Sequence, residues 1–397
     1  MTTHKYILRQ VQAEESHLVE LRRWFHQHPE TAREEFKTQA KIEKELDNLG
    51  LPHGRTCGTG VWADIHGLGE GTRSIVLRAD MDALSLQELS DVPYKSTVPG
   101  KMHACGHDAH TAALLGAARI LFENRERFGG IIRLIFQPAE EIGYGGRAVI
   151  REGYLDGFER SFGLHLAPSI PVGSVAVVPG PNNASCDWFR IVVKGTGAHI
   201  STPHNGVDAL QIASRIAIGA NALTTPHLDQ IDSVLVGVGK LTAGTAYNVI
   251  ASDAEVIGTI RAFTHELRKK AQEDLIALSG KTAALFGGHA EVELHDFATP
   301  LCNDAIPCRE VQKTVADLWG EEHLITSRPP SLTADDMADF ILSASGCYAY
   351  VGSSNPLLPS TCSAQHSSTF DIDERCLSIS ASLYIAYAMD YLNGLFD

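Results

Sequence analysis

Strand-like and helix-like segments alternate along the first third of the chain, and this alternation constrains the fold more than any single motif. Residues 74–78 carry the apolar run of a strand buried on both faces. An Ala- and Leu-rich helix is expected over 109–122, followed by a strand over 131–136. Strands separated by helices are typical of an α/β sheet that is largely parallel, because parallel neighbours need a crossover connection.

The segment 179–183, Pro-Gly-Pro-Asn-Asn, is the strongest linker signal in the sequence. The order of elements changes after it: we expect a strand, a helix, two strands, a helix and a strand over 188–194, 207–223, 233–241, 249–263, 266–285 and 290–296. This β-α-β-β-α-β order is typical of a ferredoxin-like domain. From residue 298 the α/β alternation resumes and closes with a helix over 377–395. We therefore expect one α/β domain, residues 1–183 and 298–397, interrupted by a small α+β domain at 184–297.

Charge and composition exclude several classes of protein. The chain has 33 Lys plus Arg against 48 Asp plus Glu, and this net charge of −15 disfavours binding to nucleic acid or to an anionic membrane. Its eight cysteines are scattered, without the close pairing of a disulfide scaffold. Residues 1–15 lack the apolar core of a signal peptide, and no stretch approaches the roughly 18 apolar residues of a membrane span. A cytoplasmic protein with reduced thiols is expected.

The densest group of chemically active residues lies at 102–110, Met-His-Ala-Cys-Gly-His-Asp-Ala-His. Three His, one Cys and one Asp at the entrance of a helix form the composition of a metal site. Cys105 and His107 are separated by one glycine, which lets both side chains converge from a tight turn. The alternative is a polar turn that only caps the helix.

A second group, Glu140 and Glu141, comes directly after the expected strand over 131–136. Ligands usually bind at the carboxyl ends of the strands of an α/β sheet, so one carboxylate could bind a metal while its neighbour transfers protons. A pair of glutamates in a solvated turn is the alternative. His165, at a third strand exit, and His366, in a loop near the C-terminus, are single histidines that spacing alone does not nominate.

Together these segments resemble the M20 metallopeptidase family, and within it the amidohydrolase branch that includes aminoacylase-like, hippurate and indole-acetyl-amino-acid hydrolases. The resemblance covers almost the whole chain in family order. The matching segments are 21–30, 77–84, 102–110, 136–141, 163–168, 248–250, 258–261, His366 and 370–374. It implies a zinc-peptidase-like catalytic domain with an inserted ferredoxin-like domain that serves as lid and dimerisation face.

The resemblance also implies roles for individual residues. A site for two divalent metal ions, zinc or manganese, would be held by Cys105, His107, Glu141, His165 and His366. Glu140 would be the general base. His199 would stabilise the oxyanion from the partner subunit, while Asn248 and Arg261 would bind the carboxylate of the substrate.

The sequence departs from the family at three places, one of which is that residues 365–368, Gln-His-Ser-Ser, lack the proline often found just after this histidine. Asp80 stands where many relatives have a metal-ligating histidine, so whether Asp82 still orients the site is open. Residues 334–337, Ala-Asp-Asp-Met, replace a Gly-Ser-Glu-Asp-Phe sequence, so the preferred substrate does not transfer from any one relative.

The expected activity is hydrolysis of the amide bond of an N-acyl or N-aroyl amino acid by a homodimer or a larger homo-oligomer. A dipeptidase or carboxypeptidase that acts on short peptides is the alternative with the same chemistry. A non-catalytic binding protein that retains the fold is the alternative from another class.

Overall fold

The computed structural model describes residues 3–224 and 234–397, and these divide into two compact units. The first unit contains residues 1–180, 303–328 and 336–397, and the second contains residues 181–302 and 329–335. Residues 329–335, expected in the α/β domain, belong to the second unit because Ser331 exchanges backbone hydrogen bonds with Asn182 and Ala184. Within the described residues, no helix has both the length and the apolar character needed to cross a membrane.

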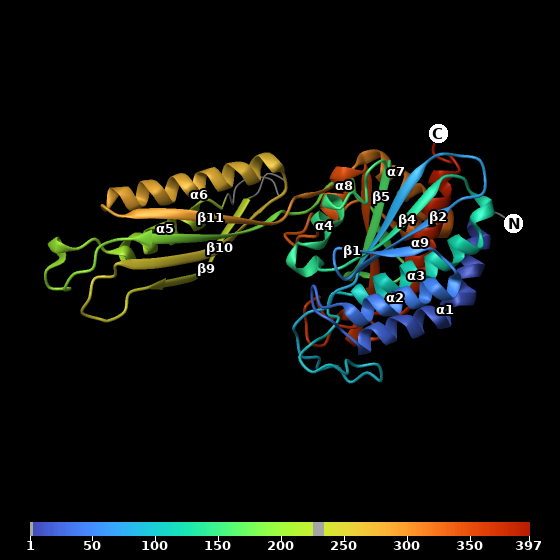
Figure 1. The fold of residues 1–397 in the computed structure, drawn as a ribbon, viewed down its shortest axis with the longest axis horizontal. Helices are drawn as coiled ribbons and strands as arrows, with labels where there is room; N and C mark the ends of the chain where they lie inside the picture. Colours follow the sequence, from blue (N-terminus) through green and yellow to red (C-terminus); the bar gives the residue numbers. More distant parts are fainter. Residues whose placement is uncertain (1–2, 225–233) are drawn as a thin grey trace. The chain divides into compact units, whose positions relative to one another are not determined.

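The first unit is built on an eight-stranded sheet (Figure 1). Its strands, in spatial order, are β1 (His53–Thr56), β2 (Gly60–His66), β4 (Ile131–Gln137), β3 (Ser74–Asp80), β5 (Arg160–Pro171), β14 (Gly346–Ser354), β6 (Val175–Ala176) and β13 (Leu324–Ile325). The four central strands β4, β3, β5 and β14 are parallel to one another, whereas β1, β2 and β4 pair antiparallel, as do β14 and β6. The largely parallel sheet predicted above is therefore parallel at its centre and mixed towards its edges.

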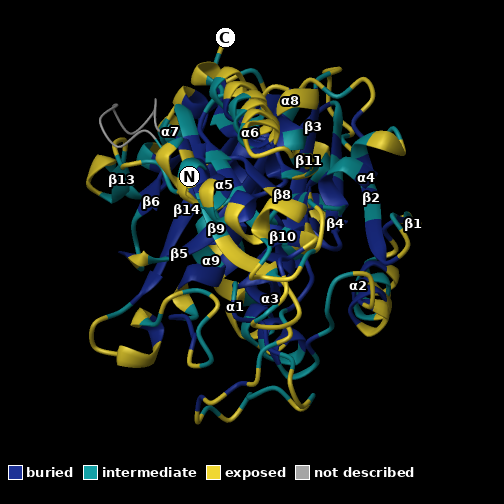
Figure 2. Ribbon diagram, turned by 90° about the vertical axis from the view of Figure 1, so that its left-hand side faces the viewer, coloured by how far each residue is buried: buried dark blue, intermediate teal, exposed yellow. Residues whose placement is uncertain are grey.

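Helices cover both faces of this sheet, so β3 and β14 are buried along their whole length. Figure 1 shows α1 (Thr3–Gln27), α2 (Phe36–Leu49) and α3 (His107–Glu123) on one side of the strands, and α4 (Gly145–Arg151) and α8 (Met337–Ser343) on the other. The remaining helices of the unit are α7 (Ala305–Trp319) and α9 (Arg375–Leu392), of which α9 packs against α1 and α3. Figure 2 shows the strands as the most deeply buried part of this unit.

Helix α3 lies at the centre of the helical layer and carries the densest sequence cluster at its N-terminus. Most of its residues are buried, because small alanine side chains let α1 and α9 approach closely. At Gly116 a Cβ atom would lie 2.3 Å from Cδ2 of Leu18 in α1, so a glycine is needed there for close packing.

The second unit contains a four-stranded antiparallel sheet covered on one face by two helices. The elements follow the chain as β8 (Cys186–Lys194), α5 (Ala209–Ala222), β9 (Val234–Ala243), β10 (Asp253–Ala262), α6 (His265–Leu285) and β11 (His289–Ala298), and the spatial order is β11-β8-β10-β9. In β8, Phe189, Ile191 and Val193 are buried against the helices while the intervening side chains are not, which is the alternation expected of a half-buried strand.

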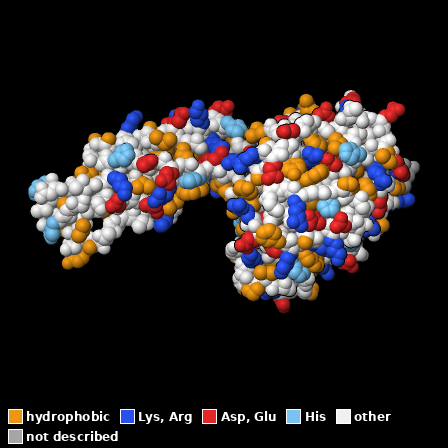
Figure 3. Space-filling view, in the orientation of Figure 1, with side chains coloured by type: hydrophobic (Ala, Val, Ile, Leu, Met, Phe, Trp, Pro, Cys, Tyr) orange, Lys and Arg blue, Asp and Glu red, His pale blue; other side chains and the backbone are white. Residues whose placement is uncertain are grey.

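The predicted mixed α/β fold class and the β-α-β-β-α-β order are confirmed. Residue 233, the first of the expected strand over 233–241, lies outside the described residues, and the expected strand over 249–263 begins only at Asp253. At the chain's entry to and exit from the second unit, β7 (Gly180–Asn183) and β12 (Leu301–Asn303) pair in a short sheet. On the face drawn in Figure 3, basic and acidic side chains are interspersed, so the net negative charge does not form one continuous patch.

Candidate metal centre

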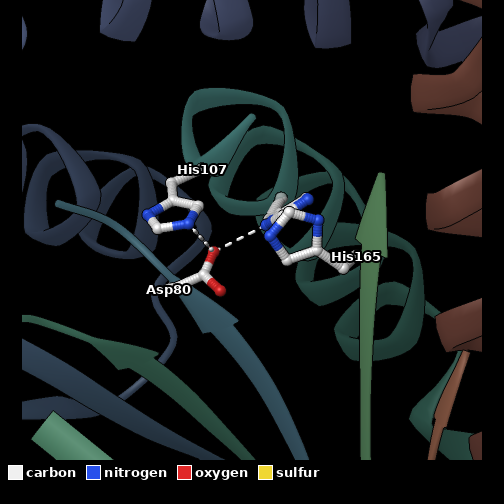
Figure 4. Close-up of side chains that lie close together, drawn as sticks. Asp80, His107 and His165 are labelled. Atoms are coloured by element: carbon white, nitrogen blue, oxygen red, sulfur yellow. Dashed lines mark hydrogen bonds and ion pairs between the residues drawn. The ribbon is translucent and has the colours of Figure 1, made fainter. Parts of the chain in front are cut away.

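The site forms at the ends of β3 and β4, beside the middle of β5. β3 ends at Asp80, which pairs with Gln137 at the end of β4, and Arg78 pairs with Gly163 of β5. This register places Asp80 level with His165, two residues further along β5. Helix α3 begins beside them at His107, and Figure 4 shows Asp80, His107 and His165 turned towards one another from three different elements.

The structure brings all five predicted metal ligands together. Ligand atoms of Cys105, His107 and Glu141 all lie within 4.8 Å of one another. The Sγ atom of Cys105 is 3.6 Å from Nε2 of His165, and Nε2 of His366 is 3.4 Å from Oε1 of Glu141. The loop that carries His366 is held at the cluster because the His366 N–H donates to the carbonyl of Ala104 at 2.8 Å.

Two of the histidines have their tautomers fixed by the backbone. Nδ1 of His107 donates to the carbonyl of Asp82 at 2.9 Å, and Nδ1 of His165 donates to the carbonyl of Leu166 at 2.8 Å. Both rings therefore present Nε2 to the cluster as a lone pair. A hydrogen bond from the far nitrogen to a carbonyl is the usual support of a metal-binding histidine.

Two atoms of the cluster are buried without a hydrogen-bond partner among the described residues: Nε2 of His107 and Oε1 of Glu141. Oε1 of Glu141 has the ring of His366 within ion-pair distance, at 3.4 Å, but within the described part of the chain neither of these two atoms makes a hydrogen bond. Buried polar atoms are nearly always hydrogen-bonded, so these two atoms favour a bound cation. A thiol, three imidazoles and a carboxylate are also the ligand types that zinc prefers. The residues present therefore fit a metal site.

A neighbouring group, Asp80 with His110, is close enough to hold an ion but is already fully hydrogen-bonded. Nδ1 of His110 donates to Oδ1 of Asp80 at 2.6 Å, while its Nε2 accepts from the N–H of Leu166 at 3.0 Å. The other oxygen of Asp80 accepts from Arg78 at 2.7 Å. These residues support the cluster, because their ligand atoms are occupied by protein partners.

Asp82 contacts the cluster, and the sequence left its role open. Its two carboxylate oxygens accept from the backbone N–H groups of Glu140 and Glu141, each at 3.1 Å, and Oδ1 lies 3.5 Å from Nδ1 of His107. It thus ties the turn that carries both glutamates to a ring of the cluster. The pattern Asp80-Met81-Asp82 after a buried strand was its only signal in the sequence.

Glu140 is buried in this turn, with Oε2 3.9 Å from Nε2 of His107. Its carboxylate therefore lies beside the cluster. This is the position a proton-transferring group needs if it is to reach a water molecule held by the ligands.

The charges of the site are strongly coupled. Burial opposes ionisation of Asp80, but His107 and Arg78 hold the pKa of its carboxyl well below the usual range. Burial also opposes a charge on His107, yet Asp80 and Cys105 raise its pKa well above that of a free imidazole. Contacts with Cys105 and Glu141 raise the pKa of His366 to about 10. Acidic neighbours thus favour positive charge at His107 and His366, as they would favour a bound cation, whereas burial and the neighbouring His110 hold the pKa of His165 well below its ordinary value.

The three predicted site residues of the second unit do not converge within it. His199 is exposed and lies beside Asn248, since the N–H of the next residue, Ile200, donates to the Asn248 carbonyl at 3.1 Å. Both precede Asp253, the first residue of β10, whereas Arg261 is near the other end of this strand. Asp253 and Arg261 are about 26 Å apart along the strand. Within one copy of this unit, His199 and Asn248 therefore lie far from Arg261.

Comparison with known proteins agrees with the fold and with the metal centre. Residues 76–390 match peptidase family M20/M25/M40. The chain is 39% identical to an N-acetyl-L-cysteine deacetylase of Bacillus subtilis, over 94% of this chain and 87% of that protein. It is 34% identical to thermostable carboxypeptidase 2 of Saccharolobus solfataricus, over 96% of each chain.

Among solved structures, the chain is similar to a dinuclear metal-binding peptidase of the M20 family from Bacillus subtilis. The TM-score is 0.84 and the identity 32%, with 96% of this chain and 99% of that chain covered. The predicted family resemblance and the predicted enzyme class are thus confirmed. The chain belongs to peptidase family M20/M25/M40 and is a hydrolase of the amidohydrolase and peptidase type.

Proposed function

We propose that this hydrolase uses two divalent metal ions to cleave the amide bond of N-acyl or N-aroyl amino acids. The observation that carries the proposal is that Nε2 of His107 and Oε1 of Glu141 are buried without a hydrogen bond among the described residues, with Nε2 of His107 beside the carboxylate of Glu140. The ligands are Cys105, His107, Glu141, His165 and His366. Zinc and manganese both suit this mixture of thiol, imidazole and carboxylate.

When bound, such ions lower the pKa of a water molecule and polarise the scissile carbonyl. The chain's own contribution is proton transfer by Glu140. Its carboxylate accepts a proton as the water oxygen bonds to the carbonyl carbon, and it then donates this proton to the nitrogen as the carbon–nitrogen bond breaks. The remaining proton of the water also passes to the nitrogen, so the products are a carboxylate and a protonated amine, and atoms and charge balance without another reactant.

The substrate class is supported by the two kinds of relative. The names of the N-acetyl-L-cysteine deacetylase and the carboxypeptidase both describe cleavage of an amide bond to the nitrogen of an amino acid. In the proposed enzyme the guanidinium of Arg261 binds the substrate carboxylate, for which its planar fork is well shaped. Asn248 assists in binding the carboxylate, and His199 donates to the oxyanion.

His199 and Arg261 are too far apart in one copy to contact the same small substrate. If both act in catalysis, one of them comes from a second copy of the chain. The proposed enzyme is therefore a homodimer in which His199 and Asn248 act on the partner's substrate. Mixing E140Q with H199A tests this directly, because the mixed dimer contains one intact site. Recovery of activity on mixing supports the proposal, and two mutants that stay inactive together contradict it.

Replacement of Glu140 tests the catalytic proposal. E140Q should lower kcat by about two to four orders of magnitude, the usual contribution of a general acid–base residue. Metal content per subunit should not change, because Glu140 is not among the ligands. Activity within tenfold of the wild type would refute the assigned role.

A panel of substrates separates the alternatives. N-acetyl and N-benzoyl amino acids should be cleaved faster than dipeptides, and the reverse order would favour a dipeptidase or carboxypeptidase, as the carboxypeptidase relative suggests. Metal-loaded protein that binds these compounds but cleaves none of them would instead indicate a binding protein.

A further inference from the structure

The turn between β4 and α4, which carries Glu140 and Glu141, begins with an unusual backbone conformation. Ala139, the residue before the proposed general base, has φ of 56° and is completely buried. This left-handed region is disfavoured for residues with a Cβ atom, and such conformations persist only where the surroundings impose them. The direction in which the chain enters Glu140 therefore depends on what holds Ala139.

The N–H of Ala139 is held by a carboxylate from a distant part of the chain. It donates to Oε1 of Glu35 at 2.9 Å, and Glu35 is fully buried. The other oxygen of Glu35 accepts from the hydroxyl of Thr59 at 2.6 Å. On its other side, the carbonyl of Ala139 accepts from the N–H groups of Tyr144 and Gly145, each at 3.2 Å. Among the described residues, the hydrogen bond with Glu35 is the one that Ala139 makes with a group outside the turn.

Glu35 directly precedes α2, but its side chain does not cap that helix. The capping role belongs to Glu30, whose Oε2 accepts from the N–H groups of Lys37 and Thr38 at 2.8 and 2.9 Å. Glu30 thus caps the N-terminus of α2, and the side chain of Glu35 has no such role in this helix. A buried carboxylate aimed at one backbone N–H of the catalytic turn needs another explanation.

The hydrogen bond between Ala139 and Glu35 is the first of three similar hydrogen bonds made by successive residues. Moving along the chain, the N–H of Ala139 donates to Glu35, and those of Glu140 and Glu141 donate to the two oxygens of Asp82. Two buried carboxylates therefore hold three successive backbone N–H groups. Asp82 fixes the two glutamates themselves, whereas Glu35 acts one residue earlier, on the residue with the left-handed conformation.

We propose that Glu35 is a positioning residue for catalysis, which holds Ala139 in the left-handed conformation and so aims the carboxylate of Glu140 at the reacting water. The inference rests on the proposed role of Glu140. Among the described residues, the Glu35 side chain hydrogen-bonds to the N–H of Ala139 and to Thr59 and to none of the proposed metal ligands, so its effect on the site passes through the backbone. Loss of this contact should lower the rate of the chemical step and leave substrate and metal binding largely intact.

A double-mutant cycle with Ala139 tests the inference, because glycine adopts positive φ without the cost that alanine incurs. E35A should lower kcat by about 10- to 100-fold, the range expected when a catalytic group is misplaced, with KM and metal content within about twofold of wild type. In the A139G background the same substitution should cost at most about a fifth as much. E35Q keeps one oxygen acceptor for the Ala139 N–H and should retain most activity. Glu34, the exposed neighbour, provides the matched control E34A, which should not change kcat.

A second readout does not depend on activity. Hydrogen exchange of the peptide that contains residues 138–142 should be faster in E35A than in the wild type and unchanged in E34A. If E35A does not fold, E35D replaces it, because it keeps a carboxylate but is one methylene too short to reach both partners. Wild-type kcat for E35A, or a loss of the same size with A139G, overturns the inference. An active E140Q would instead overturn the proposed general base, while the exchange data would still report whether Glu35 holds the turn.

Discussion

Substitution of Asp82 by Asn would test how the metal centre is held together. Asp82 accepts two backbone N–H groups, from Glu140 and Glu141, each at 3.1 Å, and is buried. Asn has one carbonyl oxygen and one amide group, so it can accept one of these N–H groups while its own N–H₂ faces the other. The substitution changes no volume and leaves the backbone carbonyl of Asp82, which orients His107, in place.

The size of the effect follows from this geometry. One buried N–H group loses its acceptor, which costs about 1–3 kcal/mol. Because that group belongs to the turn that carries Glu141, much of the cost falls on metal binding. Loss of a residue that supports metal ligands usually weakens metal affinity by about 10- to 100-fold. At about 1.4 kcal/mol per factor of ten, this agrees with the cost of the lost hydrogen bond.

The assay is competition for zinc against a chromophoric chelator, with kcat measured at saturating metal. D82N should bind the metal at least about tenfold more weakly and should remain slower at saturation, because the turn with Glu140 is displaced. The matched control is D64N, which breaks the bidentate pair between Asp64 on β2 and Arg133 on β4 and should leave metal affinity unchanged. Wild-type affinity and kcat in D82N would refute the reasoning.

Three further changes probe the fold, its pH dependence and the ligand set. R22M removes a fully buried guanidinium that contacts three carboxylates. The substitution should lower the free energy of unfolding by about 3–5 kcal/mol in denaturant titrations of metal-free protein, and a change below about 1 kcal/mol would contradict this. The hydrogen bond to Asp390 raises the pKa of His4 against the effect of burial, so its stabilising effect is complete below about pH 6.5 and is lost as pH rises through the raised value. The difference in unfolding free energy between wild type and H4Q should therefore shrink between pH 6 and pH 9, and a constant difference would show that the pair does not titrate. C105S should lower zinc content after dialysis against a weak chelator, whereas C362S, at an exposed cysteine, should not; equal zinc contents would remove Cys105 from the ligands.

The sequence predicts the elements of the fold better than their arrangement. The helix beginning at Phe36 ends at Leu49 because Gly50, with φ of 69°, closes it, which is a local signal. The position of β4 between β2 and β3 is not local, since it depends on long-range pairing of strands with similar apolar patterns. The two-residue strands β6 and β13 are too short to show any period.

In the site, too, local signals could be predicted and long-range contacts could not. Cys105, His107 and Glu141 were nominated from composition because thiols, imidazoles and paired carboxylates at strand ends are chemically unusual. His165 and His366 needed the family resemblance, since a single histidine carries no pattern of its own. Glu35 could not be found at all, because its partner is a backbone N–H group about a hundred residues away, and a backbone group leaves no trace in the sequence.

The segment 21–30 shows why a motif rich in histidine and arginine need not be catalytic. Arg22 and His26 both contact Oδ2 of Asp108, at 2.9 and 2.7 Å, and Asp108 directly follows His107 in α3. Burial opposes ionisation of Asp108, yet Arg22 and His26 hold the pKa of its carboxyl below the usual range, so a charged, anchored residue fixes the first turn of α3. The motif therefore supports the candidate metal centre indirectly, because it fixes the end of the helix from which His107 reaches the cluster. Much of the family pattern in this chain specifies where the ligands are held, and only a few residues specify the ligands.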